Sequence, residues 1–97
     1  MDKPSYVYML ASAPYGTLYI GSTTDLIKRV WQHREEVVAG FTKTYGVHML
    51  VWFEIHNELI SAAAREKNMK KWKRAWKVDF ISTHNPQWRD LYEEIIA

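Results

Sequence analysis

The chain has 97 residues, 47% of them hydrophobic, and a formal net charge of +2 at pH 7. That length suits one domain with one core, and the apolar fraction excludes an intrinsically disordered chain. The absence of cysteine excludes a disulfide framework and a thiolate metal site. The N-terminus shows no signal-peptide pattern, and no apolar run approaches the roughly 18 residues of a membrane helix, so we expect a cytoplasmic protein with no membrane association.

The first half of the chain predicts a hairpin followed by a helix. Residues 5–10 and 17–21 are rich in aromatic and β-branched side chains, and Pro14 and Gly16 lie in the turn between them. Residues 23–25 offer N-cap side chains for a helix that should run to about Val38 and stop at Gly40. Its expected apolar face consists of Leu26, Ile27, Val30, Trp31, Val37 and Val38.

The second half predicts one more strand and further helices. Residues 47–56 form a nearly continuous apolar run, which favours a strand at the centre of the sheet, covered on both faces. A basic helix should follow, capped by Asn57 or Ser61, then a helical piece over residues 74–83 and a short C-terminal helix. The order predicts an α/β (α+β) fold: a small three-stranded antiparallel sheet flanked by helices.

The basic residues are concentrated in one stretch. Seven of the 13 Lys and Arg residues lie between Arg65 and Lys77, together with one acid, Glu66. Such a block can attract a polyanion such as nucleic acid, or it can simply form a solvated helix face. Trp72 and Trp76 in this stretch could stack on bases, although their i, i+4 spacing is also typical of core residues.

Glu66 stands out within the basic helix. At about 100° per residue, Ala62, Glu66, Met69 and Trp76 fall in one narrow sector, so Glu66 should lie on or beside the buried face. A carboxylate in that position needs a partner. A salt bridge, for example to Arg29, would satisfy it, and so would a divalent metal, because Mg²⁺ needs only one or two protein carboxylates.

Four further side chains have the chemistry of a phosphodiesterase site. Arg29 and His33 are one helical turn apart; Arg29 could clamp a phosphate and His33 could move a proton near neutral pH. Tyr8 and Tyr19 would present two phenols on the hairpin, and Gly21 leaves room for close approach. Taken singly, each of these residues is more often an ordinary surface or core residue.

These residues together resemble the GIY-YIG endonuclease superfamily. Tyr19-Ile20-Gly21 matches the second motif, and Tyr6-Val7-Tyr8 is similar to the first, with its final tyrosine kept. Residues 25–29 resemble the helix that carries the family arginine, and residues 64–67 resemble the segment with the metal-binding glutamate. Residues 85–91 resemble the tail of a small stand-alone bacterial branch. The resemblance covers nearly the whole chain and implies a single GIY-YIG domain over residues 1–97.

The resemblance implies a metal-dependent endonuclease that acts on DNA, with structure rather than sequence specificity and a role in DNA repair or recombination. Glu66 would hold Mg²⁺ or Mn²⁺, Tyr19 would help to activate the attacking water, and Tyr8 would support the site. Arg29 would stabilise the transition state, and His33 would complete the arrangement. Contacts to nucleic acid are expected from the basic side chains Lys67, Lys70, Lys71, Lys73 and Arg74.

Several alternatives stay open. The mild net charge and the altered first motif are compatible with a nucleic-acid-binding module that has kept the fold and lost turnover. Joint exposure of Trp31, Trp52 and Trp88 would instead indicate a protein-interaction subunit. A protein partner could supply the specificity that 97 residues leave out. Many family members use an asparagine after the glutamate helix. Asn85 is the obvious candidate, but its spacing from Glu66 is longer than expected, so it is left out of the core site.

Overall fold

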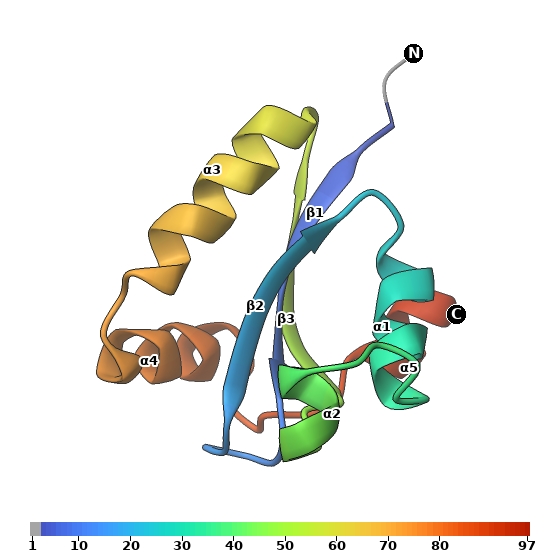
Figure 1. The fold of residues 1–97 in the computed structure, drawn as a ribbon. Coiled ribbons are helices and arrows are strands. Elements are labelled where there is room, and N and C mark those ends of the chain that lie inside the picture. The colour runs from blue at the N-terminus through green and yellow to red at the C-terminus, as the bar shows by residue number, and fades with distance from the viewer. Residues whose placement is uncertain (1–2) are drawn as a thin grey trace.

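The computed structural model describes residues 3–97, and Figure 1 shows their arrangement. The elements follow in the order β1 (Ser5–Ala11), β2 (Leu18–Thr23), α1 (Leu26–Arg34), α2 (Phe41–Tyr45), β3 (Met49–His56), α3 (Leu59–Lys70), α4 (Arg74–His84) and α5 (Tyr92–Ile96). The strands form one antiparallel sheet with helices on both of its faces. The expected α+β class is confirmed.

The sheet has the order β2-β1-β3, so β1 is the central strand and β3 lies at an edge. The prediction that residues 47–56 form the central strand is therefore wrong. The reason is a bulge: Met9 pairs with Trp52, but Leu10 pairs with Leu50, which leaves Val51 as an extra residue. Leu50, Val51 and Trp52 are all buried, because Leu50 packs on the α1 side of the sheet and Val51 and Trp52 pack on the α3 side, whereas Phe53 and Ile55 are exposed.

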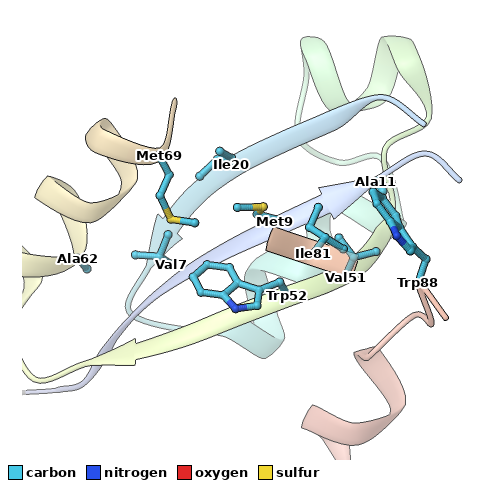
Figure 2. Packing of buried hydrophobic residues seen from close by; sticks show 10 residues of the cluster. All are labelled: Val7, Met9, Ala11, Ile20, Val51, Trp52, Ala62, Met69, Ile81 and Trp88. Atoms are coloured by element: carbon cyan, nitrogen blue, oxygen red, sulfur yellow. The ribbon is translucent and has the colours of Figure 1, made fainter. Parts of the chain in front are cut away.

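Two hydrophobic clusters sit on opposite faces of the sheet. The first joins Val7 and Met9 to Ala62 and Met69 of α3 and to Ile81 of α4; its ten residues are shown in Figure 2. The second joins Tyr8 and Leu10 to Leu26 and Val30 of α1, with α5 packed against it. Alternation along β1 thus sends even-numbered residues towards α1 and odd-numbered residues towards α3.

Helix α1 is shorter than the sequence suggested. It ends at Arg34, and Glu36 then turns the chain with a φ of 57°. Only a narrow stripe of α1 is buried, Leu26, Val30 and His33, because the small sheet offers it little surface. Of the expected apolar face, Ile27, Trp31 and Val37 are exposed.

Helix α2 was not predicted from the sequence. It has only five residues and lies between Gly40 and Gly46, whose φ values are 105° and 61°. Gly46 ends the helix in the left-handed conformation, which glycine adopts without steric cost. Residues 35–40, where the long helix was expected to end, are not helical, and α2 follows them.

The basic stretch is divided between two helices. Helix α3 ends at Lys70 and α4 begins at Arg74, so the helical phase that grouped Trp76 with Glu66 does not continue across the break. Trp76 is exposed, whereas Trp72 packs against the first hydrophobic cluster. The N-cap of α3 is Glu58 and not Asn57 or Ser61.

Candidate active site

The first part of the site is the contact between Tyr8 and Gly21. The two residues are cross-strand partners in the β1–β2 hairpin. A Cβ atom at position 21 would lie 2.5 Å from the Tyr8 hydroxyl oxygen and 2.6 Å from its Cζ atom. Only glycine therefore lets the Tyr8 ring cross β2 at this point, which gives a physical reason for a glycine two residues after Tyr19.

Tyr8 is held in place by a buried histidine. Its hydroxyl oxygen lies 3.1 Å from Nε2 of His33, and Nδ1 of the same ring lies 3.0 Å from Oγ1 of Thr42 in α2. His33 is 2% exposed, and burial lowers its pKa to about 4, with the charge of Arg29 and the nearby His48 acting in the same direction. His33 is thus neutral at pH 7, which corrects the expectation that it exchanges a proton near neutral pH.

Tyr19 packs beside this pair. Its ring centroid lies 6.3 Å from that of Tyr8 and 5.4 Å from that of His33. Burial raises the pKa of the Tyr8 hydroxyl, Tyr19 and Glu66 raise it further, and the charge of Arg29 opposes the rise. Tyr8 therefore remains a protonated phenol at pH 7, able to donate a hydrogen bond and unsuited to act as a base.

Arg29 lies one turn before His33 on α1 and is partly exposed. Within residues 3–97 its side chain forms no ion pair or hydrogen bond. Its charge acts on both Tyr8 and His33. The salt bridge to Glu66 that the sequence left open is not formed, and the guanidinium is available for an anion.

Glu66 approaches from α3, on the opposite face of the sheet. Its Oε1 accepts a hydrogen bond of 2.5 Å from Ser22 Oγ, and its Oε2 accepts one of 2.5 Å from Lys70 Nζ. Burial alone would raise the pKa of Glu66, but these two hydrogen bonds and the charge of Lys70 outweigh it and hold the pKa below its ordinary value. Glu66 is thus ionised at neutral pH.

The two groups of side chains meet around the edge strand β2. Ser22, which holds Glu66, directly follows Gly21, which lies against Tyr8. Because successive residues of a strand point to opposite faces, β2 presents Tyr19 to the α1 side and Ser22 to the α3 side. The site therefore wraps around one edge of the sheet.

A comparison with protein families gives a match over residues 4–79 to the GIY-YIG catalytic domain. The chain belongs to the GIY-YIG family. It is 35% identical over 86 residues to the UPF0213 protein SpyM50708 of Streptococcus pyogenes serotype M5, a match covering 88% of this chain and 92% of the relative. The UPF0213 protein SpyM3_1077 of S. pyogenes serotype M3 is 34% identical over the same shares of both chains.

A solved structure supports the same assignment. The solution NMR structure of the UPF0213 protein BH0048 from Bacillus halodurans matches with a TM-score of 0.56 and 26% identity, over 90% of this chain and 92% of that one. GIY-YIG proteins form a family of nucleases, and their substrates are nucleic acids. Within the described part of the chain, no helix has both the length and the hydrophobicity of a membrane-spanning segment.

The side chains expected to bind nucleic acid in this GIY-YIG domain are all exposed: Lys67, Lys70, Lys71, Lys73 and Arg74. Two of them have other contacts. Lys70 pairs with Glu66, and Arg74 donates to the carbonyl oxygens of Tyr15 and Gly16 at 2.7 and 2.9 Å. Arg74 thereby ties the hairpin turn to α4, and its contact with nucleic acid stays a prediction.

The side chain of Asn85 forms hydrogen bonds with the backbone. It is buried; its Nδ2 donates to the carbonyl oxygens of Val51 and Arg89, and its Oδ1 accepts from the backbone N–H of Arg89. It therefore fastens the end of α4 to the bulge of β3.

Sequence reasoning missed Thr42, and it missed the contact of Ser22 with Glu66. Thr42 gave no signal, because a threonine in an unpredicted helix matches no motif. Ser22 could have been found: it follows the glycine of the second motif, and strand alternation places it on the face that α3 covers. The joint exposure of Trp31, Trp52 and Trp88 does not occur, since Trp52 and Trp88 are buried.

Proposed function

We propose that this protein is a metal-dependent endonuclease that cleaves DNA according to its structure rather than its sequence, with a role in repair or recombination. One observation carries the proposal. The edge strand β2 joins the two parts of the site: the Tyr8 hydroxyl lies against Gly21, and the next residue, Ser22, donates a hydrogen bond to Glu66. With Tyr19 beside Tyr8 and with the guanidinium of Arg29, these residues make up a set of groups that could bind and cleave a phosphodiester.

Arg29 would bind the scissile phosphate. Its guanidinium has no partner within residues 3–97, and its planar donors suit two phosphate oxygens at once. As negative charge develops on the phosphate in the transition state, a fixed guanidinium stabilises that charge more than it stabilises the ground state. Tyr19, beside the Tyr8–His33 pair, would orient the attacking water.

Tyr8 would donate a hydrogen bond into the site. The two tautomers of neutral His33 differ in which neighbour donates to the ring. In one, Tyr8 donates to Nε2 and Nδ1 donates to Thr42 Oγ1; in the other, Thr42 donates to Nδ1 and Nε2 donates to the Tyr8 oxygen. The second tautomer would leave the hydrogen of Tyr8 free for substrate, and His33 would then orient it.

Glu66 would hold a divalent cation, Mg²⁺ or Mn²⁺. The donor set fits such an ion, because a carboxylate and the Ser22 hydroxyl supply hard oxygen ligands side by side. No group of three or more His, Cys, Asp or Glu side chains could hold a metal among residues 3–97, so waters and phosphate oxygens would complete the shell. When bound, the cation would polarise the phosphate and stabilise the leaving oxygen.

The exposed lysines of α3 and the loop after it would bind the phosphate backbone. Contacts of this kind position a nucleic acid without reading its sequence, which supports structure specificity. Binding should weaken steeply with added salt, because each neutralised phosphate releases a counterion.

Cleavage of flapped, branched and single-stranded DNA with Mg²⁺ or Mn²⁺ tests the proposal. Wild type should cut at least one substrate, and Glu66→Gln and Arg29→Ala should each lose roughly 10²- to 10³-fold in rate. Glu58→Gln, at the exposed start of α3, and Lys28→Ala, beside Arg29, are matched controls that should retain most activity.

Equal rates in wild type, Glu66→Gln and Arg29→Ala would refute the catalytic proposal. If DNA were bound but never cut, and binding were indifferent to Glu66→Gln, the chain would be a nucleic-acid-binding module on the same fold. Mg²⁺ titration followed by NMR separates the two cases, since such a module has no reason to bind Mg²⁺ at Glu66.

A further inference from the structure

Two aromatic side chains of α2 extend the site outwards. Phe41 and Tyr45, called here the α2 aromatic face, are 45% and 57% exposed. The Phe41 ring stacks on the Tyr19 ring, with centroids 6.3 Å apart and an angle of 29° between the ring planes. The ring centroids of Tyr45 and Phe41 are 4.8 Å apart. The three rings form a row that starts at a motif tyrosine and ends in solvent.

Buried contacts of α2 hold this row of rings in position. Thr42, between the two exposed rings in sequence, is buried and bonded to His33. The backbone N–H of Val47 bonds to the carbonyl oxygen of Thr42, which fixes the end of α2. The α2 aromatic face is therefore preorganised, and little conformational entropy is lost when a ligand stacks on it.

We infer that the α2 aromatic face is a stacking site for an unpaired nucleobase next to the scissile phosphate. The inference rests on the proposed function and narrows its substrate. Aromatic rings bind bases of single strands by stacking, because every base has a π-face. Lys43, exposed between the two rings in sequence, adds a positive charge for the backbone. In an intact duplex the bases are already stacked, so the face favours DNA with an unpaired segment.

Trp76 is another exposed aromatic residue to consider as a stacking site. It is 58% exposed and lies among lysines, as base-stacking residues often do. It belongs to α4, however, which packs on the face of the sheet opposite to α1. The α2 aromatic face instead touches Tyr19 directly, which makes it continuous with the site.

The experiment measures binding without cleavage. A fluorescein-labelled oligothymidylate and a blunt duplex of equal length are titrated with protein in EDTA, so that the result does not depend on catalysis. The variants are Phe41→Leu, Tyr45→Leu and the double variant, with Trp76→Leu as the matched control. Leucine keeps an apolar side chain at an exposed position and removes only the ring, and thermal unfolding verifies that each variant is folded.

We expect the double variant to bind the oligothymidylate roughly tenfold more weakly or worse, with duplex affinity within about twofold of wild type. Trp76→Leu should leave both affinities nearly unchanged. The inference is overturned if the double variant binds like wild type, if single strand and duplex weaken equally, or if only Trp76→Leu weakens binding. Failure of the proposed nuclease would be seen separately, as an absence of cleavage with metal present.

Discussion

The two sides of the β2 edge hold their functional groups in opposite ways. On the α1 side, Tyr8, His33 and Thr42 form a buried chain of neutral hydrogen-bonding groups. On the α3 side, Glu66 is ionised and bonded to Ser22 and to Lys70, whose side chain is 50% exposed. The first arrangement is rigid because buried polar groups are costly to separate, whereas the second is exchangeable because water can replace an exposed lysine.

This difference suits the separate tasks that we propose for the two sides. A neutral, buried chain of hydrogen bonds can hold a phenol in one orientation over the whole physiological pH range. A hydrogen-bond donor needs such a fixed orientation. A partly exposed carboxylate can release a lysine and accept another cation. The following experiments test the contrast, from the largest expected effect to the smallest.

Gly21→Ala should have the largest effect, since Gly21 lies where the two sides meet. The added Cβ would come within 2.6 Å of the Tyr8 ring and displace it from His33. We expect a loss of about 3 kcal/mol in the free energy of unfolding, measured by urea denaturation, together with loss of cleavage.

A second substitution tests whether the clash with Tyr8 causes the loss of stability. Tyr8→Leu in the Gly21→Ala background should recover part of the folding stability but no cleavage, because the clash is removed together with the phenol. Unchanged stability of Gly21→Ala alone would show that the Tyr8 ring moves aside freely.

As the pH is lowered, the stability contributed by the α1 side should be lost before that contributed by the α3 side. The pKa of His33 is about 4 in the folded protein, below its ordinary value of 6.5, so the unfolded chain binds more protons between these pH values. Stability should fall by roughly 1–3 kcal/mol as the pH drops through this window. The pKa of Glu66 is also lowered, so its contribution is lost only below its ordinary value of 4.5.

Urea denaturation at several pH values, compared between wild type and His33→Gln, measures the first step. Glutamine keeps a polar side chain that does not titrate. In this variant the free energy of unfolding should therefore change less steeply with pH between pH 6.5 and 4. An equal slope in both proteins would show that another group causes it.

Thr42→Val removes one hydroxyl from the buried chain at constant shape. Because His33 Nδ1 then loses its partner, we expect a loss of about 1–2 kcal/mol in unfolding free energy. The imidazole ¹⁵N shifts of His33 should also change from the Nε2–H tautomer to a mixture. Thr42→Ser should restore the wild-type tautomer, and a wild-type spectrum for Thr42→Val would contradict the role given to this hydroxyl.

Lys70→Met should have the smallest effect. The Lys70–Glu66 ion pair is exposed at the lysine, and exposed pairs of this kind contribute about 0.5 kcal/mol or less. Mg²⁺ affinity, measured by calorimetry, should stay the same or rise, because a competing cation has been removed. A loss of more than about 1 kcal/mol in stability would show that the α3 side is as rigid as the α1 side.

Much of this fold could be predicted from local pattern. The hairpin, the four longer elements after it and the position of Glu66 near a buried face follow from periodicity and composition. Two errors show where local pattern was not enough. The bulge at Val51, fastened by Asn85, made an edge strand look central. The break after Lys70 removed Trp76 from the phase of Glu66.

The candidate site divides in the same way. The sequence by itself determined which chemical groups are present: two phenols, a guanidinium, an imidazole and a carboxylate, in the order that indicates the GIY-YIG family. Only the tertiary structure decided what each group can do, because pKa and hydrogen-bond direction depend on burial and on partners far away in the chain. Burial lowers the pKa of His33, and Thr42, nine residues later, is hydrogen-bonded to its Nδ1. Ser22, 44 residues before Glu66, donates a hydrogen bond to that carboxylate at the edge of the sheet.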